Sequence, residues 1–291
     1  AADSLDKEEK IGLDHKESTT NSFPLSYAQT GVYIECMKTP SSTVYNIPSL
    51  VTFSHQTDTE KLKDAVEYVL SIHPQFFVHF ESNANGVVQV YNRPATIAVD
   101  IRETTQEALA DYKHEFVQPF NLNQGPLYRA EIVKTESNVY LLLDVHHLVF
   151  DGSSFDIFLR ELCTRLNGEP LDKEDLDYAH YVTEEKEGEN SEQYKEASRF
   201  FAQELGNLEG STDLEPDLTI TNTNGSNQTV SAPFKLSDVD TFCREHGITP
   251  AHLSLAAVFY TLARFANTDK VCITTISNGR SNLRIANTIG M

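Results

Sequence analysis

The chain has 291 residues, of which 40% are hydrophobic, enough for a substantial core in about two domains or lobes. Its 23 basic and 43 acidic residues give a formal net charge of −20 at pH 7. This balance disfavours nucleic acid as a partner, because duplex binding needs clustered Lys and Arg. Every apolar run is far shorter than the ~18–20 residues of a membrane span, and no signal segment opens the chain. We therefore expect a cytoplasmic protein.

The four cysteines agree with that compartment. Cys36, Cys163, Cys243 and Cys272 are widely spaced and form no Cys-x-x-Cys pair. A zinc ribbon or a small disulfide framework needs closer, patterned spacing. Cys163 and Cys272 lie inside apolar patterns, so we expect both to be buried as small hydrophobic side chains rather than to act as catalytic thiols.

The first half of the chain alternates between helical and strand patterns. Residues 1–21 are polar and acidic, which predicts a flexible lead-in. Ser26 and Gln29 have the spacing of a capping box, and residues 57–60 repeat it before a helix that His73-Pro74 ends. Further elements are expected as strands at 45–53, 76–80 and 86–91, a helix over 104–119, and a hairpin of 127–134 with 139–145.

The second half begins with an acidic stretch at residues 168–192, which reads as a solvated connection and a lobe boundary. A polar loop is expected at 210–228. The remaining expected elements are helices at 191–205, 237–247 and 249–267 and a strand at 271–276. The helix at 249–267 is apolar nearly all round, so we expect it to be buried.

The most informative segment follows the hairpin. Residues 139–143 form a near-continuous apolar run, as expected for a strand covered on both faces. The run leads into His146-His147-Leu148-Val149-Phe150-Asp151-Gly152, and then into a helix. The apolar residues on one face of that helix are Phe155, Phe158, Leu159, Leu162 and Leu166. A polar cluster therefore sits where a buried strand turns into a helix, and rigid elements on both sides fix its geometry.

The residues alone leave three interpretations of this cluster open. The first is a strand end with satisfied core histidines, since neutral imidazole is a common buried hydrogen-bonding group. The second is a metal site, which is disfavoured because successive side chains of a strand point to opposite faces, so that His146 and His147 should diverge. The third is acid–base catalysis, with one histidine in a cleft and the other as its support.

The catalytic interpretation also assigns roles to Asp151 and Gly152. Asp151 can hold the turn or orient an imidazole ring by accepting a hydrogen bond. Gly152 permits a positive φ and lets a substrate approach the backbone closely. Such a group suits the removal or guidance of a proton from an amine or hydroxyl that attacks an acyl group.

At this point the sequence resembles the condensation domains of nonribosomal peptide synthetases. Residues 146–154 match that family's His-His-x-x-x-Asp-Gly-x-Ser motif in full. Residues 24–33 (Pro-Leu-Ser-Tyr-Ala-Gln-Thr-Gly-Val-Tyr) are similar to its opening Ser-x-Ala-Gln segment, and residues 177–182 (Asp-Tyr-Ala-His-Tyr-Val) resemble its Tyr-x-Asp-Tyr-Ala segment. The order and spacing also fit, so the resemblance covers the chain from about Phe23 to Met291.

The sequence departs from the family pattern in two places. The segment Arg-His-Glu-x-Leu-Arg of the family appears here as residues 72–77, where Phe77 replaces the arginine that pairs with the motif aspartate in relatives. Because a buried unpaired carboxylate is costly, Asp151 needs another partner, and Arg129 on the neighbouring expected strand is our hypothesis. In addition, residues 289–291 look like the start of a further motif, so we expect a fragment with part of the second lobe missing.

The resemblance implies an α/β fold of two chloramphenicol-acetyltransferase-like lobes, the first complete and the second partial. It places the N-terminal lobe at residues 22–178 and the incomplete C-terminal lobe at 179–291. It implies amide bond formation between acyl or peptidyl and aminoacyl thioesters. Those groups arrive on the phosphopantetheine arms of donor and acceptor carrier domains, beside an adenylation domain, and the domain itself binds no cofactor and no metal. His147 is the implied catalytic residue, with His146, Asp151 and Gly152 in support.

Other branches and classes remain as alternatives. An epimerisation domain usually has Trp where this chain has Phe155, and a heterocyclisation domain replaces the histidines with aspartate. A standalone acyltransferase using a coenzyme A thioester is a second alternative, and a non-catalytic platform that recruits carrier or tailoring proteins is a third. We interpret Tyr27 and Gln29 as capping and packing residues, and His252 as a satisfied core residue.

Overall fold

The computed structural model describes residues 21–84, 86–94, 96–171, 177–206, 212, 231–232, 238–280 and 283–291. The chain divides into two compact units, the first made of residues 1–191 and 278–291 and the second of residues 192–277. Nearly all of the expected lead-in and of the loop at 210–228, and part of the acidic connection, lie outside the described residues. The lobe boundary expected between residues 178 and 179 stays a prediction.

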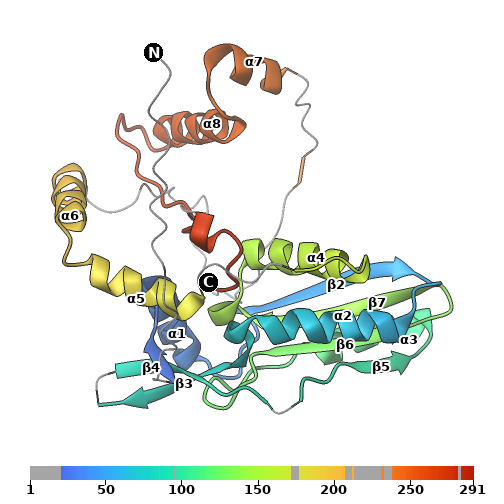
Figure 1. Ribbon diagram of the computed structural model, residues 1–291. Coiled ribbons are helices and arrows are strands. Elements are labelled where there is room, and N and C mark those ends of the chain that lie inside the picture. Colours follow the sequence, from blue (N-terminus) through green and yellow to red (C-terminus); the bar gives the residue numbers. More distant parts are fainter. Residues whose placement is uncertain are drawn as a thin grey trace, which may run out of the picture. The chain divides into compact units, whose positions relative to one another are not determined.

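The first unit is built on a four-stranded sheet with the order β2-β7-β6-β5 (Figure 1). Its strands are β2 (Asn46–Ser54), β5 (Asp100–Glu103), β6 (Tyr128–Lys134) and β7 (Asn138–His146). β7 pairs antiparallel with both β2 and β6, and β5 joins β6 in parallel. The strand expected at 45–53 and the hairpin that ends in the histidines are thus confirmed.

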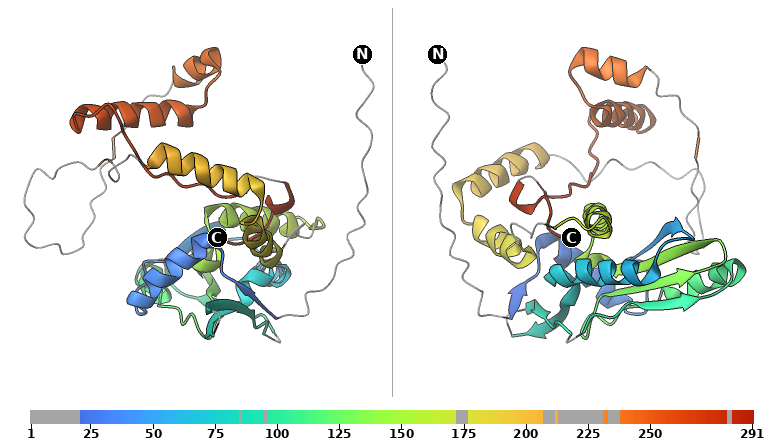
Figure 2. Two further views of the ribbon diagram at one scale, coloured as in Figure 1. Left: turned by 90° about the vertical axis from the view of Figure 1, so that its left-hand side faces the viewer. Right: turned by 45° about the vertical axis from the view of Figure 1, so that its right-hand side comes forward.

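Both faces of this sheet are covered, as the apolar run in β7 predicted. Leu141 and Leu143 of β7 belong to the main core together with buried residues of α2 (Thr59–Ile72) and α4 (Gly152–Leu166). Figure 1 and the right-hand view of Figure 2 show α2 across one face of the sheet with α4 beside it. On the other face, Tyr140 and Leu142 pack against α3 (Gln106–Phe116). β7 is therefore a central, fully enclosed strand.

A second, smaller sheet has the order β1-β4-β3 and borders the first helix. It consists of β1 (Ser22–Pro24), β3 (Val78–Asn83) and β4 (Gly86–Tyr91), and α1 (Tyr27–Lys38) follows β1 directly. The two strands expected at 76–80 and 86–91 do pair with each other, as β3 and β4. However, residues 74–77 form a 3-10 turn rather than strand, because Pro74 at its start offers no N–H to a ladder. α5 (Tyr178–Gly188) packs against β1.

Most helix starts follow the expected chemistry. Ser26 and Gln29 form the complete capping box of α1. The helix α2 differs, because Asp58 rather than the expected Thr57 is its N-cap and accepts hydrogen bonds from two backbone amides of the first turn. An ionised carboxylate is the stronger acceptor at a helix N-terminus, where the helix dipole adds to the hydrogen bonds. The amphipathic face of α4 is confirmed, with Phe158 and Leu162 buried.

The second unit contains three helices within the described residues: α6 (Glu192–Leu205), α7 (Val239–His246) and α8 (Pro250–Phe265). All three were expected. The burial of α8 was not predicted correctly, since no residue of α8 is buried and Phe265 is 77% exposed. An apolar helix is buried only where other elements cover it, and α7 packs on α8 along a short stretch. The strand expected at 271–276 is also absent from this described stretch, where Ile276 is 97% exposed.

The cysteines differ in part from expectation. Cys36 and Cys243 are buried, whereas Cys163 is exposed and Cys272 is half-buried. Cys163 follows the buried Leu162 in α4, and one residue turns the helix by about 100°, which brings Cys163 to the outer face. The apolar pattern around it did not resolve this rotation. None of the helices in the described part of the chain is long and apolar enough to cross a membrane.

Candidate active site

β7 carries the two histidines to the end of the four-stranded sheet. His146 is the last residue of β7 and lies opposite Asn46 of β2. His147 begins a 3-10 turn (His147–Val149), and its backbone N–H donates to the carbonyl of Tyr45 at 2.8 Å. The ladder therefore ends between the two histidines. Their side chains enter different surroundings, which agrees with the divergence expected for neighbours on a strand.

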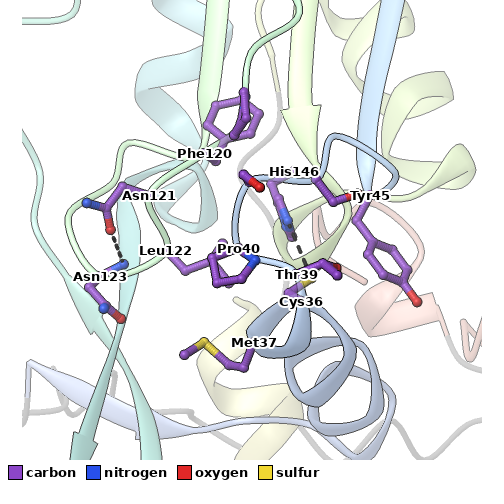
Figure 3. Close-up of a pocket in the computed structure, with 13 residues that line it drawn as sticks. Cys36, Met37, Thr39, Pro40, Tyr45, Phe120, Asn121, Leu122, Asn123 and His146 are labelled. Carbon is purple, nitrogen blue, oxygen red and sulfur yellow. Dashed lines mark hydrogen bonds between the residues drawn. The ribbon is translucent and has the colours of Figure 1, made fainter.

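His146 is enclosed and held neutral. Its side chain is buried, and Phe120 lies edge-on to the ring. Burial, with a smaller contribution from the charge of His147, lowers the pKa of His146 to about 4. Its Nδ1 accepts a hydrogen bond from the backbone N–H of Leu148 at 3.2 Å, so the neutral ring carries its proton on Nε2. That Nε2 lies 3.7 Å from Sγ of Cys36 (Figure 3).

His147 is the more accessible of the two rings. Its side chain is half-buried, and Tyr45 lies edge-on with 6.5 Å between ring centroids. Nδ1 of His147 is buried and has no hydrogen-bond partner among the described residues. Of the two imidazoles, His146 is fully committed to internal contacts. His147 is therefore the ring that this arrangement leaves open to a reacting group.

Asp151 connects the histidine turn to the following helix. It is the N-cap of α4, and its Oδ1 accepts a hydrogen bond from the backbone N–H of Ser154 at 2.7 Å. Arg280 donates to both carboxylate oxygens, at 2.7 Å to Oδ2 and 3.1 Å to Oδ1. The Asp151 side chain is 17% exposed and the Arg280 side chain is 11% exposed. This two-point pair satisfies the Asp151 carboxylate where it lies close to the histidines.

The hypothesis that Arg129 pairs with Asp151 is therefore wrong. In the β6–β7 ladder Arg129 lies opposite Asp144, and its guanidinium donates to the fully buried carboxylate of Asp144. Burial raises the pKa of Asp144, while the hydrogen bond from Asn46 and the charge of Arg129 act in the opposite direction. Proximity of the two strands was predicted correctly. The register, which fixes the partner, was not.

The C-terminal segment packs on the site through Ser154. The Ser154 hydroxyl donates to the carbonyl of Gly290 at 2.8 Å and accepts from the N–H of Gly290 at 3.0 Å. Arg280 adds hydrogen bonds to the Ser154 hydroxyl and to the carbonyl of Thr288, both at 3.1 Å. A Cβ atom at Gly290 would lie 2.1 Å from the ring of Tyr178. Glycine is thus required here by close packing.

Gly152 differs in part from its expected role. It is the first residue of α4, and it is not among the described glycines with a positive φ. The positive φ that glycine permits is therefore not used at Gly152, since the N-terminal turn of a helix uses ordinary helical angles. A Cβ at this position would meet no atom within 4 Å. Close approach of a substrate to Gly152 stays a prediction.

Gln29 of α1 is hydrogen-bonded to the turn that contains His147. Its Nε2 donates to the carbonyl of Leu148 at 2.6 Å and to Oε1 of Gln89 at 2.9 Å, and Nε2 of Gln89 donates back to Oε1 of Gln29. Gln75 donates to the same Gln89 oxygen at 2.9 Å. The three side chains are buried. Gln29 therefore caps and packs α1, as interpreted, and also anchors the backbone next to His147.

Two further histidines make their side-chain hydrogen bonds within their own helices. His180 is exposed and contacts Asp177, the N-cap of its own helix. His252 was expected in the core, but it is exposed and completes the capping box of α8 with Thr249. Arg280 was missed altogether, because nothing in the sequence around residues 278–280 marks it. The only signal was indirect, namely an aspartate expected to need a cation.

Within the part of the chain that the structure describes, no three His, Cys, Asp or Glu side chains come together in a group that could hold a metal ion. Asp151 is paired with Arg280, and His146 contacts Leu148 and Cys36. This arrangement can present the His147 imidazole to a substrate. The N-terminus of α4 and the Asp151–Arg280 ion pair follow it in the fold.

Comparison with known proteins identifies the family. The Condensation domain family matches residues 19–291. Surfactin synthase subunit 2 of Bacillus subtilis (strain 168) is 29% identical over 283 residues, which cover 92% of this chain and 8% of that protein. Gramicidin S synthase 2 of Aneurinibacillus migulanus is 27% identical, with 94% and 6% covered. The chain thus spans less than a tenth of the length of these relatives. It belongs to the condensation-domain family.

Solved structures share the fold. The condensation domain from the Monacolin K polyketide synthase MokA is similar with a TM-score of 0.79 and 20% identity, covering 93% of this chain and 66% of that one. The first condensation domain of the CDA synthetase gives a TM-score of 0.73 at 17% identity, covering 94% and 69%. The expected α/β, chloramphenicol-acetyltransferase-like fold is confirmed.

Proposed function

We propose that the chain acts as a condensation domain of a nonribosomal peptide synthetase and forms amide bonds between carrier-bound thioesters. One observation carries the proposal. His147 is the accessible ring at the end of β7, while its neighbours His146 and Asp151 are immobilised by their own partners, Cys36 and Arg280. A fixed surrounding with one free imidazole is the arrangement that a positioned acid–base group needs.

The proposed reaction joins an acyl or peptidyl donor to an aminoacyl acceptor. The acceptor amine attacks the donor thioester carbon, a carbon–nitrogen bond forms, and the carbon–sulfur bond breaks. His147 accepts the amine proton or orients the amine, and the proton ends on the released thiolate sulfur. His146 cannot take this role at neutral pH, because its Nδ1 already accepts a hydrogen bond and its pKa is lowered to about 4. General-base assistance is worth ~10²–10⁴ in rate.

The proposed partners follow from the substrates. Both acyl groups would arrive on phosphopantetheine arms of a donor and an acceptor carrier domain, next to an adenylation domain, and the domain would bind no cofactor or metal of its own. The relatives are named as synthases, and the match to this chain covers 8% and 6% of their lengths. We place the protein in the cytoplasm, with neither nucleic acid nor membrane as a partner.

The test uses the domain within its natural polypeptide and two loaded carriers. Intact-mass spectrometry follows transfer of the donor acyl group onto the acceptor arm, for the wild type and for His147→Ala. We expect product from the wild type and a loss of ~10²-fold or more in the variant. His180→Ala, which changes an exposed histidine of α5, is the matched control and should stay active. A folded wild type that forms no product with several amino acids contradicts the proposal.

A non-catalytic platform is the second candidate, and one comparison favours it. The X-domain in the complex of the X-domain and OxyB from Teicoplanin Biosynthesis is similar to this chain with a TM-score of 0.76 at 21% identity, covering 93% of this chain and 63% of that one. The fold is therefore compatible with a recruiting role. Amide formation by the wild type that is lost in His147→Ala would decide against the platform, since recruitment alone forms no amide bond.

A further inference from the structure

A cavity lies on the His146 side of the site. Its volume is about 550 Å³, within the usual range for small-molecule sites. Its lining includes four apolar side chains, namely Met37 at the end of α1, Pro40 in the following loop, and Phe120 and Leu122 from the segment before β6. Figure 3 shows the His146 ring directed toward Cys36. The lining thus combines apolar side chains with a thiol and an imidazole.

The lining of this cavity is uncharged. The remaining lining residues are hydroxyl, amide, proline and tyrosine side chains, and none is acidic or basic apart from His146. Burial keeps His146 neutral at pH 7 and raises the pKa of the Cys36 thiol, so both remain uncharged. In a chain with a net charge of −20, an uncharged cavity of this size excludes carboxylates and phosphates by desolvation and favours neutral groups.

The cavity adjoins the proposed reaction centre through two residues. His146 lines it and directly precedes His147 in the chain. Tyr45 lines it as well, and the same residue lies edge-on to the His147 ring and accepts the hydrogen bond of the His147 backbone. A group held in the cavity is therefore one side chain away from the imidazole.

The wall formed by residues 119–122 is fixed in place. Arg129 donates to the carbonyls of Gln118 (2.7 Å) and Pro119 (3.1 Å), and its guanidinium stacks 3.8 Å from the centroid of the Phe120 ring. The Arg129 guanidinium is anchored in turn by Asp144. Such a wall keeps its shape when a ligand enters, which is the condition for size selection.

We propose that this cavity binds the neutral, apolar acyl group of a thioester substrate and selects it by size. The proposal rests on the proposed function and names a determinant of its substrate range. Charged parts of a carrier-bound arm would stay outside, and the hydroxyl and amide side chains of the lining would face the amides of the substrate. Cys36 and Met37 line the same cavity and serve as the reporter positions of the tests below.

The first test measures occupancy through the thiol of Cys36 and needs no catalysis. The chain is alkylated with iodoacetamide, and peptide mass spectrometry compares Cys36 with the exposed Cys163 as internal control. The ligands are amides of phenylalanine and of N-acetylphenylalanine with an N-acetylated ethylenediamine arm, which mimic acceptor and donor and cannot acylate a thiol. We expect at least threefold slower labelling of Cys36 with one of them and no change at Cys163. The aspartate analogue should not protect.

The second test does not depend on the reactivity of Cys36. The chain contains no tryptophan, so Met37→Trp introduces a single tryptophan among the lining residues, which can be excited apart from the tyrosines. Its emission should shift with the phenylalanine analogue that protects Cys36 and not with the aspartate analogue. Tyr68→Trp, in a separate surface depression on α2, is the control and should not respond. If neither the labelling nor the fluorescence responds to either phenylalanine analogue, the cavity proposal is wrong.

The two proposals fail separately. Protection of Cys36 without amide formation by the wild type would leave the cavity standing and contradict the proposed function. Amide formation that depends on His147, without protection or a fluorescence shift, would contradict the cavity and leave the function standing. The donor-like and acceptor-like analogues then identify which of the two substrates enters the cavity.

Discussion

Arg280 and Asp151 form a two-point ion pair although 129 positions separate them in the chain. Asp151 caps the helix that follows the histidine turn, and Arg280 belongs to the segment that returns to the first unit after α8. The same guanidinium donates to Ser154 and to the carbonyl of Thr288. The geometry at the end of β7 therefore depends on residues from the opposite end of the sequence.

Replacing Arg280 should lower the stability of the first unit. The Asp151 side chain is 17% exposed in the pair, and Arg280→Ala leaves its carboxylate without a cation. We expect a loss of about 2 to 4 kcal/mol in the free energy of unfolding, between the values for surface and buried pairs. Urea unfolding of the first unit measures this change. Arg280→Lys should recover part of it, because Lys keeps the charge but loses the two-point geometry.

Arg284→Ala is the matched control for Arg280→Ala. Arg284 lies in the same segment and pairs with Glu184, but both side chains are 49% exposed. The loss should be much smaller, because exposed ion pairs contribute little. Equal losses for the two arginines would show that the Asp151 pair has no special weight.

Gln29→Met should lower the rate of the proposed reaction through the position of His147. The variant keeps the side-chain volume but removes the hydrogen bond to the carbonyl of Leu148, the residue after His147. Gln75→Met is the control, because it also breaks a buried amide bond to Gln89 but does not touch the turn. We expect both variants to lose stability, and only Gln29→Met to lower kcat by about tenfold with KM nearly unchanged.

The structural alternative for Gln29 has a different signature. If Gln29 only packs α1, the two variants should lower kcat equally when compared at the same loss of stability. Rescue offers a second readout. Gln29→Glu keeps the shape but places an acceptor opposite the Leu148 carbonyl, so it should be worse than Gln29→Met at neutral pH, since two acceptors repel each other.

The sequence predicted the elements that local pattern and helix capping determine. β7, the helix α4 with its apolar face and the Ser26–Gln29 capping box all follow from residues that are close together in the chain. The divergence of His146 and His147 follows from strand geometry alone. These features need no knowledge of distant partners.

The failures share a physical cause, which is dependence on register and distant packing. Arg129 was placed on the correct strand, but its partner Asp144 is set by the ladder register. Arg280 comes from a segment without a recognisable pattern. The exposure of α8 depends on which elements cover it, and apolar composition does not report that. Pairs between distant residues are therefore the part of the site that the sequence left open.

Gly290→Ala should detach the C-terminal segment from the site. A Cβ at residue 290 would lie 2.1 Å from the Tyr178 ring, which is buried and bonded through its hydroxyl to Ser26 (3.1 Å) and to the carbonyl of Met291 (2.7 Å). We expect a loss of stability of about 1 to 3 kcal/mol from overpacking, measured by urea unfolding. Gly188→Ala, at the C-terminal end of α5 where a Cβ would meet no atom within 4 Å, is the control. A loss as small as that of Gly188→Ala would mean that residues 288–291 do not pack on Tyr178.

The enclosed ring of His146 should make the stability of the first unit depend on pH. Its pKa is lowered from 6.5 to about 4, mainly by burial, so the unfolded chain binds a proton that the folded ring does not accept. The stabilisation from the neutral ring is fully present above pH 6.5 and is lost as the pH falls toward 4. Between pH 7 and pH 5 this amounts to about 2 kcal/mol by linkage.

The comparison of wild type with His146→Gln isolates this contribution. Glutamine does not titrate, so the other groups that titrate in this range cancel in the difference between the two proteins. Urea unfolding at pH 7 and pH 5 should show a stability loss about 2 kcal/mol larger for the wild type. His55→Gln, which changes an exposed histidine at the far end of the β2–β7 pair, is the comparison variant outside the site. Parallel curves for wild type and His146→Gln would show that His146 is not held neutral, and its assignment as the supporting rather than the reacting histidine would fail with it.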